Sequence, residues 1–591
     1  MDTINNEMVN LKINGIPVQV PKGYTILQAA REANIEIPTL CYLKDLNCIG
    51  ACRVCMVEAI INNKPARSLL AACVYPVEEG MEVFTNTPAV RKSRKLTLEL
   101  LLANHNKKCL SCEKSTNCEL QRLAREYGCD EEHFKSEPPR YDIDDISPYI
   151  VRDNNKCIQC MRCVAACKNV QTVSVIGAIQ RGFNAHVGSA FDKSLADSPC
   201  VGCGQCVVSC PVGALKEKSQ EDKVWDAIAD PNKKVIFFTA PSIKATLGES
   251  FGMPIGTNVE GKMAAAIRRL GKDVTIFNMD FTADLTIMEE ANELVERVTK
   301  GGVLPMFTSC CPGWVKFVEH YYPEFTPNLS TCKSPQAMFG AVLKGYYAQK
   351  NGLKPEDIFV VSVIPCTAKK FEVTREQLRS EPEYDDVDVA LTTRELARMI
   401  QRAGIKFTEL EDEDYALPFN NATGGGAIFG ATGGVLEAAL RTAAHTLDGD
   451  FKKVDFEEVR GPEPIRTVTY EVAGTKITVA VASGLGNARK ILEMIKSGEL
   501  DCQMVEIMAC PGGCINGGGQ PIQSDSVLNT VDYKALRSKA LYDYDINSEF
   551  RCSHDSPVIK MIYGEFFEKP GSEKSHKYLH THYVERGHFY K

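Results

Sequence analysis

Cysteine is the residue type with the most chemical potential in this sequence, and it occurs 25 times in 591 residues. Disulfide frameworks are typical of small secreted domains, not of a chain of this length. The N-terminal sequence MDTINNEMVN has neither the basic stretch nor the apolar run of a secretion signal, so we expect a reducing, cytoplasmic location. Thiols in such number therefore predict metal binding, and their spacing indicates which metal.

Two cysteine quartets repeat one spacing, C-x2-C-x2-C-x3-C. Bacterial ferredoxins use this spacing to hold two 4Fe-4S clusters, with the fourth cysteine of each run ligating the other cluster. Pro211 follows the second quartet as that signature expects, whereas Lys168 follows the first. Zinc knuckles use two C-x2-C pairs or cysteine and histidine mixtures, so we favour iron over zinc. The predicted ligands are Cys157, Cys160, Cys163, Cys167, Cys200, Cys203, Cys206 and Cys210.

A third set near the N-terminus is a candidate 2Fe-2S site. It consists of Cys41, Cys52, Cys55 and Cys73, and it is similar to plant-type ferredoxins except that ten residues, not four, separate the first two ligands. Cys48 could replace Cys41, but only three residues separate it from Cys52. We therefore expect Cys48 to be a bystander.

A fourth set mixes histidine with cysteine: His105, Cys109, Cys112 and Cys118. On its own, a histidine before C-x2-C indicates a surface residue or a zinc ligand. Between two iron-sulfur modules, a 4Fe-4S cluster with one imidazole ligand is the better interpretation. A neutral ligand in place of a thiolate shifts the potential of the cluster. The four predicted clusters would form a wire in series.

Three motifs in the second half each follow a short apolar run that ends at a cysteine, and together they contain Cys310, Cys311, Cys366, Cys510 and Cys514. If the runs are buried strands of an α/β sheet, these thiols lie at the carboxyl ends of the strands, where such folds build their sites. A helix that begins just after a cysteine would favour the thiolate. Four thiols suffice for a cluster, so one is left for another task.

Three segments around these cysteines resemble the signature segments of FeFe-hydrogenases: TSCCPGW, PCTAKKFE and EIMACPGGCINGGGQP. The resemblance covers nearly the whole chain, up to the terminal SHKYLHTHY. It implies an enzyme that catalyses H2 ⇌ 2 H+ + 2 e- at an H-cluster, which is a 4Fe-4S cluster joined to a diiron unit with CO, cyanide and a dithiolate amine. By resemblance, the ligands are Cys311, Cys366, Cys510 and Cys514, and Cys514 bridges to the diiron unit.

The same resemblance implies a proton path. Cys310 would face the amine, and the path would continue through Glu290, Ser330, Glu293 and Arg297. The two glutamates and the arginine lie three and four residues apart on one predicted helix. Without the resemblance, such a trio would indicate a solvated helix face.

Resemblance also assigns residues to the wall of the diiron pocket. Lys369 would donate to a cyanide, and the lining would include Pro241, Ser242, Gln336 and Met508. Ile364 stands where the family usually has methionine, which could alter packing near the cluster but not ligation.

The elements that must position these residues follow from the apolar pattern. Residues 9–20 alternate around Asn14-Gly15, which predicts a β-hairpin, and Thr25 is a candidate helix cap. Helices are expected within 91–135. After residue 230, the runs VIFF, VTIF, IFVVSVI, DVAL, ITVAVA and MVEIM alternate with helical stretches, which indicates parallel sheets.

We therefore expect a multidomain protein: an α+β, β-grasp-like 2Fe-2S domain and ferredoxin-like cluster domains, then a large α/β H-cluster domain. The expected boundaries are 1–90 for the 2Fe-2S domain, 91–138 for the histidine-cysteine 4Fe-4S domain and 139–225 for the two-cluster ferredoxin domain. The H-cluster domain would span 226–545, and a small-subunit-like strap would span 546–591. The segment TGGGAIFGATGG (423–434) matches no nucleotide-binding fingerprint, so we expect tight packing there.

The composition of the chain limits the classes of partner that it can be expected to bind. A net charge of -8 argues against nucleic-acid binding, and no apolar run is long enough to cross a membrane. The electron partner would be ferredoxin, or flavin- and NAD(P)-binding subunits of a complex, a class that includes electron-bifurcating types. CYLKDLNCIGACRVCMVEA is similar to the iron-sulfur subunit of respiratory complex I, which favours the complex. Maturation proteins would load the diiron unit.

Three alternatives stay open. The first is a stand-alone ferredoxin-dependent hydrogenase. The second is a non-catalytic redox sensor or electron carrier, which predicts a missing proton-transfer cysteine. The third is a complex I-like dehydrogenase subunit, which leaves the five cysteines of the second half unexplained.

Overall fold

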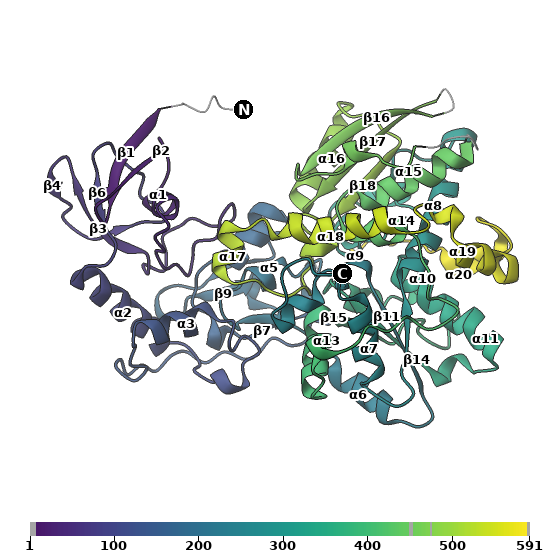
Figure 1. Cartoon of the computed structure of the whole chain (residues 1–591), viewed down its shortest axis with the longest axis horizontal. Coiled ribbons are helices and arrows are strands. Elements are labelled where there is room, and N and C mark those ends of the chain that lie inside the picture. The colour runs from purple at the N-terminus through teal and green to yellow at the C-terminus, as the bar shows by residue number, and fades with distance from the viewer. Residues whose placement is uncertain (1–6, 448–452, 473–474, 588–591) are drawn as a thin grey trace.

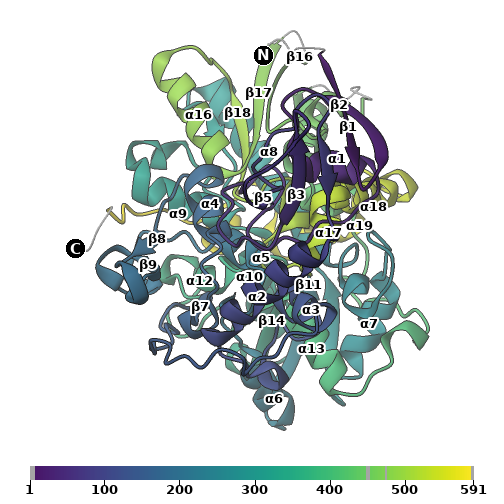
Figure 2. The same ribbon diagram turned by 90° about the vertical axis from the view of Figure 1, so that its left-hand side faces the viewer.

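The computed structural model describes residues 7–447, 453–472 and 475–587. It separates an N-terminal part, drawn in purple and blue, from a larger body that carries the remaining elements (Figure 1). Turned by 90°, the N-terminal domain faces the viewer in front of that body (Figure 2). The predicted multidomain class is confirmed.

The first domain begins with the predicted hairpin. β1 (Met8–Ile13) and β2 (Ile16–Pro21) pair antiparallel. The turn residues Asn14 and Gly15 have φ values of 50° and 83°. A type I′ turn needs positive φ at both central positions, which explains the Asn-Gly pair.

A mixed sheet completes this domain in the order β2-β1-β6-β3-β4, with β1 and β6 parallel and β5 paired to β3. α1 (Ile26–Glu32) begins at the predicted cap Thr25, which forms a reciprocal capping box with Gln28. Its apolar residues join the core of the sheet. The other strands are β3 (Met56–Ile61), β4 (Lys64–Pro65), β5 (Leu70–Ala71) and β6 (Glu82–Phe84).

Two short modules follow. The first holds the predicted helices, α2 (Pro88–Ala103) and α3 (Glu119–Glu126). The second is ferredoxin-like, with two short antiparallel pairs, β7 with β10 and β8 with β9. Its elements are β7 (Ile150–Arg152), α4 (Arg162–Ala165), β8 (Ile176–Ile179), β9 (His186–Ser189), α5 (Gln205–Ser209) and β10 (Leu215–Glu217).

The large body contains two four-stranded sheets. The first has the order β12-β11-β14-β15 and is parallel throughout. The second has the order β13-β18-β17-β16, with only the β16–β17 pair antiparallel. The predicted apolar runs form β11 (Lys234–Thr239), β12 (Thr275–Asn278), β13 (Met306–Phe307), β14 (Ile358–Ile364), β15 (Val389–Thr392), β17 (Thr475–Ser483) and β18 (Met504–Met508). The strand β16 (Ile465–Val472) was not predicted.

Helices surround both sheets, and α18 crosses the body between them (Figure 1). A glycine-rich segment packs closely, because a Cβ at Gly426 would lie 2.4 Å from the carbonyl oxygen of Asp280. The helices are α6 (Glu221–Ala229), α7 (Glu260–Arg268), α8 (Asp280–Lys300), α9 (Pro312–Tyr321), α10 (Pro335–Val342), α11 (Ala348–Asn351), α12 (Lys369–Glu372), α13 (Thr393–Arg402), α14 (Gly424–Ala427), α15 (Gly434–Leu447), α16 (Leu485–Ser497), α17 (Asp525–Thr530) and α18 (Tyr533–Asn547).

The C-terminal strap packs into the body. It carries α19 (Pro557–Ile562) and α20 (Glu573–Leu579). Ile562, Phe567 and Leu579 are fully buried in the same core as β11 and β14. Within the described residues, no helix is both long enough and apolar enough to span a bilayer.

Candidate active site and iron-sulfur sites

A cavity of about 780 Å³ lies where strands of both sheets end. β14 leads into Cys366, β18 leads into Cys510, and β13 leads into the Cys310–Cys311 pair. All five cysteines of the three motifs, including Cys514, line this cavity. The sheet edges therefore bring together thiols that are up to 204 residues apart in the sequence.

These thiols are placed to bind metal. Burial raises the pKa of Cys311, and burial together with Cys311 raises that of Cys366 to about 12. Bare thiols in such a place would stay protonated, whereas a metal ion deprotonates a coordinating thiol. The backbone N–H of Ala509 donates to Cys311 Sγ at 3.4 Å. The helix α9 begins directly after Cys311. Every cysteine of the chain is free of disulfides. A thiolate-ligated cluster fits this donor set.

The predicted lining residues are all at the cavity wall: Pro241, Ser242, Gln336, Lys369 and Met508. Ile364, the departure from the family pattern, also lines the wall and is 2% exposed.

Glu372 was not predicted and organises part of this wall. Its Oε2 lies 2.8 Å from Nζ of Lys369 and accepts hydrogen bonds from Ser334 Oγ at 2.8 Å and Gln336 Nε2 at 2.9 Å. The only signal in the sequence is that Glu372 follows Lys369 by three residues on a helix.

Residues of the expected proton path lie together beside the cavity. Burial and the charge of Glu290 hold the pKa of Cys310 well above its usual range. Burial and the charge of Glu293 raise the pKa of Glu290 to about 8. Ser330 Oγ donates to Glu293 Oε2 at 2.9 Å, and Arg297 Nη2 donates to Glu293 Oε1 at 2.5 Å. The trio on α8 is therefore not a solvated face.

Glu290 is the least satisfied member of this group. It is fully buried, and neither carboxylate oxygen has a hydrogen-bond partner of ordinary geometry among the described residues. The Ser330 hydroxyl and the Ser309 backbone amide lie close enough to oppose part of the rise in its pKa. A buried carboxyl with no fixed partner is suited to exchange protons.

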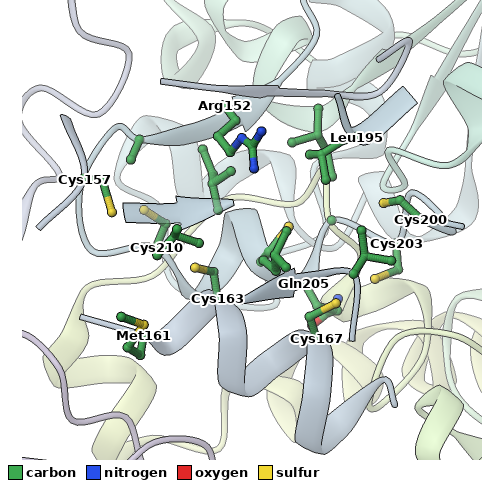
Figure 3. Close-up of a pocket in the computed structure, with 18 of the residues that line it drawn as sticks. Arg152, Cys157, Met161, Cys163, Cys167, Leu195, Cys200, Cys203, Gln205 and Cys210 are labelled. Atoms are coloured by element: carbon green, nitrogen blue, oxygen red, sulfur yellow. The ribbon is translucent and has the colours of Figure 1, made fainter. Parts of the chain in front are cut away.

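A second cavity, of about 870 Å³, lies in the ferredoxin-like module and is lined by all eight cysteines of the two quartets. In Figure 3, Cys210 lies near Cys157 and Cys163, whereas Cys167 lies toward Cys200 and Cys203. Besides burial, the charge of Cys210 raises the pKa of Cys157 and Cys160, and that of Cys167 raises the pKa of Cys203. The fourth cysteine of each quartet therefore lies with the other quartet, as the two-cluster spacing predicts.

The two cavities adjoin each other at Cys203, which lines both. A Cβ added to the next residue, Gly204, would lie 2.8 Å from the Cα of Gly518 in the catalytic body. The negative charge of Cys203 also raises the pKa of Cys510. This contact places one ferredoxin quartet directly against the thiols of the catalytic cavity.

In the 2Fe-2S domain, Cys41, Cys52, Cys55 and Cys73 are buried and contact one another. Hydrogen bonds with Cys52 and Cys73 lower the pKa of Cys41, and one with Cys73 lowers that of Cys55. Cys48 is exposed and its Sγ donates to the carbonyl of Cys73 at 2.7 Å.

The histidine-cysteine set contains a ring nitrogen that is a candidate metal ligand. Nδ1 of His105 is buried without a hydrogen-bond partner in the described chain, and burial lowers the pKa of the ring. A neutral imidazole with a free nitrogen is what a metal ligand requires.

Both outer sets adjoin the group of thiols that Cys210 forms with the first quartet. Asn47 Nδ2 donates to the carbonyls of Cys41 and Cys160, at 2.8 and 3.1 Å. A Cβ at Gly213, three residues after Cys210, would lie 2.6 Å from Cys112 Sγ. These contacts favour two branches that converge on this one group of thiols over the expected four sites in series.

Comparison with known proteins agrees with this architecture. Residues 233–518 match the family described as iron only hydrogenase large subunit, C-terminal domain, and 531–586 match the iron hydrogenase small subunit. Residues 6–88 match a 2Fe-2S iron-sulfur cluster binding domain. Residues 94–133 match the NADH-ubiquinone oxidoreductase-G iron-sulfur binding region, and 147–216 match the ferredoxin-like domain of NADH-quinone oxidoreductase subunit 3.

Relatives extend over the whole chain. The NADP-reducing hydrogenase subunit HndD of Solidesulfovibrio fructosivorans is 46% identical, covering 98% of this chain and 99% of its own. Iron hydrogenase 1 of Clostridium pasteurianum is 41% identical over 98% and 100% of the two chains. A solved structure, apo [FeFe]-hydrogenase HydA1 from Chlamydomonas reinhardtii in a variant form, has a TM-score of 0.55 at 37% identity and covers 62% of this chain and 99% of its own. The chain belongs to the FeFe-hydrogenases, oxidoreductases that act on H2, and carries N-terminal iron-sulfur domains that relay electrons.

Proposed function

We propose that this chain is the H2-converting subunit of an NAD(P)-linked hydrogenase complex. The observation that carries the proposal is the contact at Cys203, which joins a five-cysteine catalytic cavity to a chain of iron-sulfur modules. The relative HndD is by name a subunit of an NADP-reducing hydrogenase. The chain would therefore exchange electrons with partner subunits that bind flavin and NAD(P).

The H-cluster would be held by Cys311, Cys366, Cys510 and Cys514, with Cys514 also joining the diiron unit. When bound, this group supplies the site at which H2 is split or formed. The front half would hold one 2Fe-2S and three 4Fe-4S clusters. Their ligands would be Cys41, Cys52, Cys55 and Cys73; His105, Cys109, Cys112 and Cys118; and the eight thiols of the two quartets.

The protein's part in the reaction is to exclude water, orient the bound group and move protons. The apolar wall and the buried Lys369 would fix the orientation of the diiron unit. The thiol of Cys310 would pass a proton to Glu290, whose raised pKa lets it hold that proton at neutral pH. Ser330 and Glu293 would then carry the proton toward Arg297 at the end of the family's path.

We place the enzyme in the cytoplasm, because a chain with 25 free cysteines needs a reducing compartment. Electron bifurcation between NAD(P)H and ferredoxin is one form that the complex could take. The alternative is a stand-alone enzyme that uses ferredoxin directly.

Purification of the matured chain with and without its co-purifying subunits separates these two forms. With H2 as donor, we expect the isolated chain to reduce methyl viologen but not NADP+ or NAD+. Reduction of the nucleotide should appear only in preparations that contain a flavin subunit. An isolated chain that reduces ferredoxin at the viologen rate, with no flavoprotein co-purifying, would support the stand-alone enzyme instead.

A further inference from the structure

The C-terminal strap reaches the proton path at Glu293. We propose that Thr331 and the strap residue His580 form a second branch of this path, through which Glu293 exchanges a proton with an imidazole. The inference rests on the proposed proton route through Glu293, and it adds two proton-transfer residues to it.

The proposed route through Glu293 ends at Arg297, which cannot accept a proton. Arg297 binds Glu293 and donates to the backbone carbonyls of Val303, Asn328 and Leu329. A guanidinium stays charged at all ordinary pH values, so it can stabilise the Glu293 carboxylate but cannot take up its proton. Imidazole is the side chain that changes its charge near neutral pH.

Backbone pairing fixes the strap against the segment after Ser330. The N–H of Lys333 donates to the carbonyl of Leu579 at 2.8 Å, and the N–H of Thr581 donates to the carbonyl of Thr331 at 2.7 Å. Cys332 and His580 are thereby paired as in an antiparallel sheet. This pairing determines where the imidazole of His580 lies.

The Thr331 hydroxyl lies between the carboxyl group of Glu293 and the imidazole of His580. Its Oγ1 is 3.2 Å from Glu293 Oε2 and 2.8 Å from His580 Nδ1. A carboxylate oxygen of Glu293, the thiol of Cys332 and a ring nitrogen of His580 all lie within 4.8 Å of one another. One hydroxyl therefore spans the gap between carboxyl and imidazole.

The other ring nitrogen is held by Glu289. His580 Nε2 lies 3.1 Å from Glu289 Oε2, and Oε1 of this carboxylate accepts from Tyr563 at 2.5 Å and Ser575 at 2.9 Å. Although burial opposes the shift, the hydrogen bonds with His580 and Tyr563 lower the pKa of Glu289, so it stays ionised. The proton of a neutral His580 then resides on Nε2, which leaves Nδ1 free to accept one.

The transfer is balanced and involves no electrons. Protonated Glu293 gives its proton to Thr331 Oγ1, and the hydroxyl's own proton passes to His580 Nδ1. The products are a Glu293 carboxylate, paired with Arg297 at 2.5 Å, and an imidazolium that faces Glu289.

His580 also connects to the surface. Its side chain is 8% exposed, and the exposed ring of His576 lies with its centroid 4.2 Å away. The titratable groups around His580 are therefore Glu289, Glu293, Cys332 and His576.

Variants of Thr331 test the branch without disturbing the strap. In the matured holoenzyme, Thr331→Val should lower hydrogen evolution about tenfold, less than the hundredfold or more expected of a proton-transfer group that the reaction cannot bypass. Thr331→Ser keeps the hydroxyl and should restore the wild-type rate. Thr331→Val and His580→Gln should lower the rate of hydrogen evolution over the same pH range, because both variants remove the same branch.

An infrared measurement adds a readout that is independent of turnover. The carboxyl band of protonated Glu293, assigned with Glu293→Gln, should shift in Thr331→Val and not in Thr331→Ser. A Thr331→Val enzyme with the wild-type rate and pH profile would overturn the branch. An inactive wild-type enzyme would instead overturn the proposed function, and the infrared shift would still decide whether Thr331 and Glu293 are coupled.

Discussion

Glu372 and Lys369 form a 2.8 Å ion pair at the wall of the catalytic cavity, with side chains only 6% and 9% exposed. The same carboxylate accepts a hydrogen bond from Gln336. A residue that lies behind the wall thus positions two residues that line it.

Removal of this carboxylate should destabilise the protein. Glu372→Ala leaves the buried ammonium of Lys369 without its counter-charge, so we expect a loss of about 3 to 5 kcal/mol in the free energy of unfolding. Anaerobic urea unfolding measures it. The matched control is Glu381→Ala, whose partner Lys577 is half exposed, and which should cost less than about 1 kcal/mol. Equal losses in the two variants would show that the Lys369 pair is not electrostatically important.

Glu290 should make stability fall as pH rises. Its pKa is about 8 in the folded chain, against about 4.3 in an unfolded one. Between these values the folded state binds more protons than the unfolded state, so stability decreases with pH. Glu290→Gln lacks this pH-dependent loss of stability. The difference between its melting temperature and that of the wild type should therefore shift in favour of the variant from about pH 5 to about pH 8, and then stay constant.

Glu296→Gln is the control for Glu290, since Glu296 is an exposed residue on the same helix, paired with Lys300. Its melting temperature should follow the wild type at every pH. A constant difference between Glu290→Gln and wild type across this range would mean that Glu290 is ionised in the folded protein.

The architecture of the site was predictable where chemistry repeats at fixed spacing. The two quartets, the hairpin at Asn14-Gly15 and the cysteines at strand ends all follow from local sequence. The division of β14 and β18 between two sheets did not, because both are short apolar runs and nothing in either sequence specifies its neighbour. The cavity between two sheets was therefore visible only in the structure.

Contacts between residues that are far apart in the sequence were not predicted either. Cys41 and Cys160 are linked through Asn47, and Thr331 meets His580 from 249 residues away. Such contacts depend on how modules dock, which single-residue patterns do not encode. The contacts between the modules favour two converging branches of cluster sites over the expected series.

The 2Fe-2S ligand set can be tested with two neighbouring cysteines. Cys41 is fully buried against Cys52 and Cys73, whereas Cys48 is exposed. Cys41→Ser should abolish the paramagnetic resonance signal of the reduced 2Fe-2S cluster, and Cys48→Ser should retain it. Loss of the signal in Cys48→Ser alone would exchange the two assignments.

In the proposed mechanism, Cys310 connects the catalytic cavity to the proton path. The most direct test is hydrogen evolution from reduced methyl viologen by anaerobically matured protein, with wild type beside Cys310→Ala and Cys502→Ala. Cys502 is a buried thiol outside both cavities, so it controls for the loss of a buried sulfur. We predict that the wild type and Cys502→Ala evolve hydrogen and that Cys310→Ala falls at least about a hundredfold at equal iron content. Activity that survives in Cys310→Ala, or an inactive wild type with a fully loaded diiron site, would contradict the account.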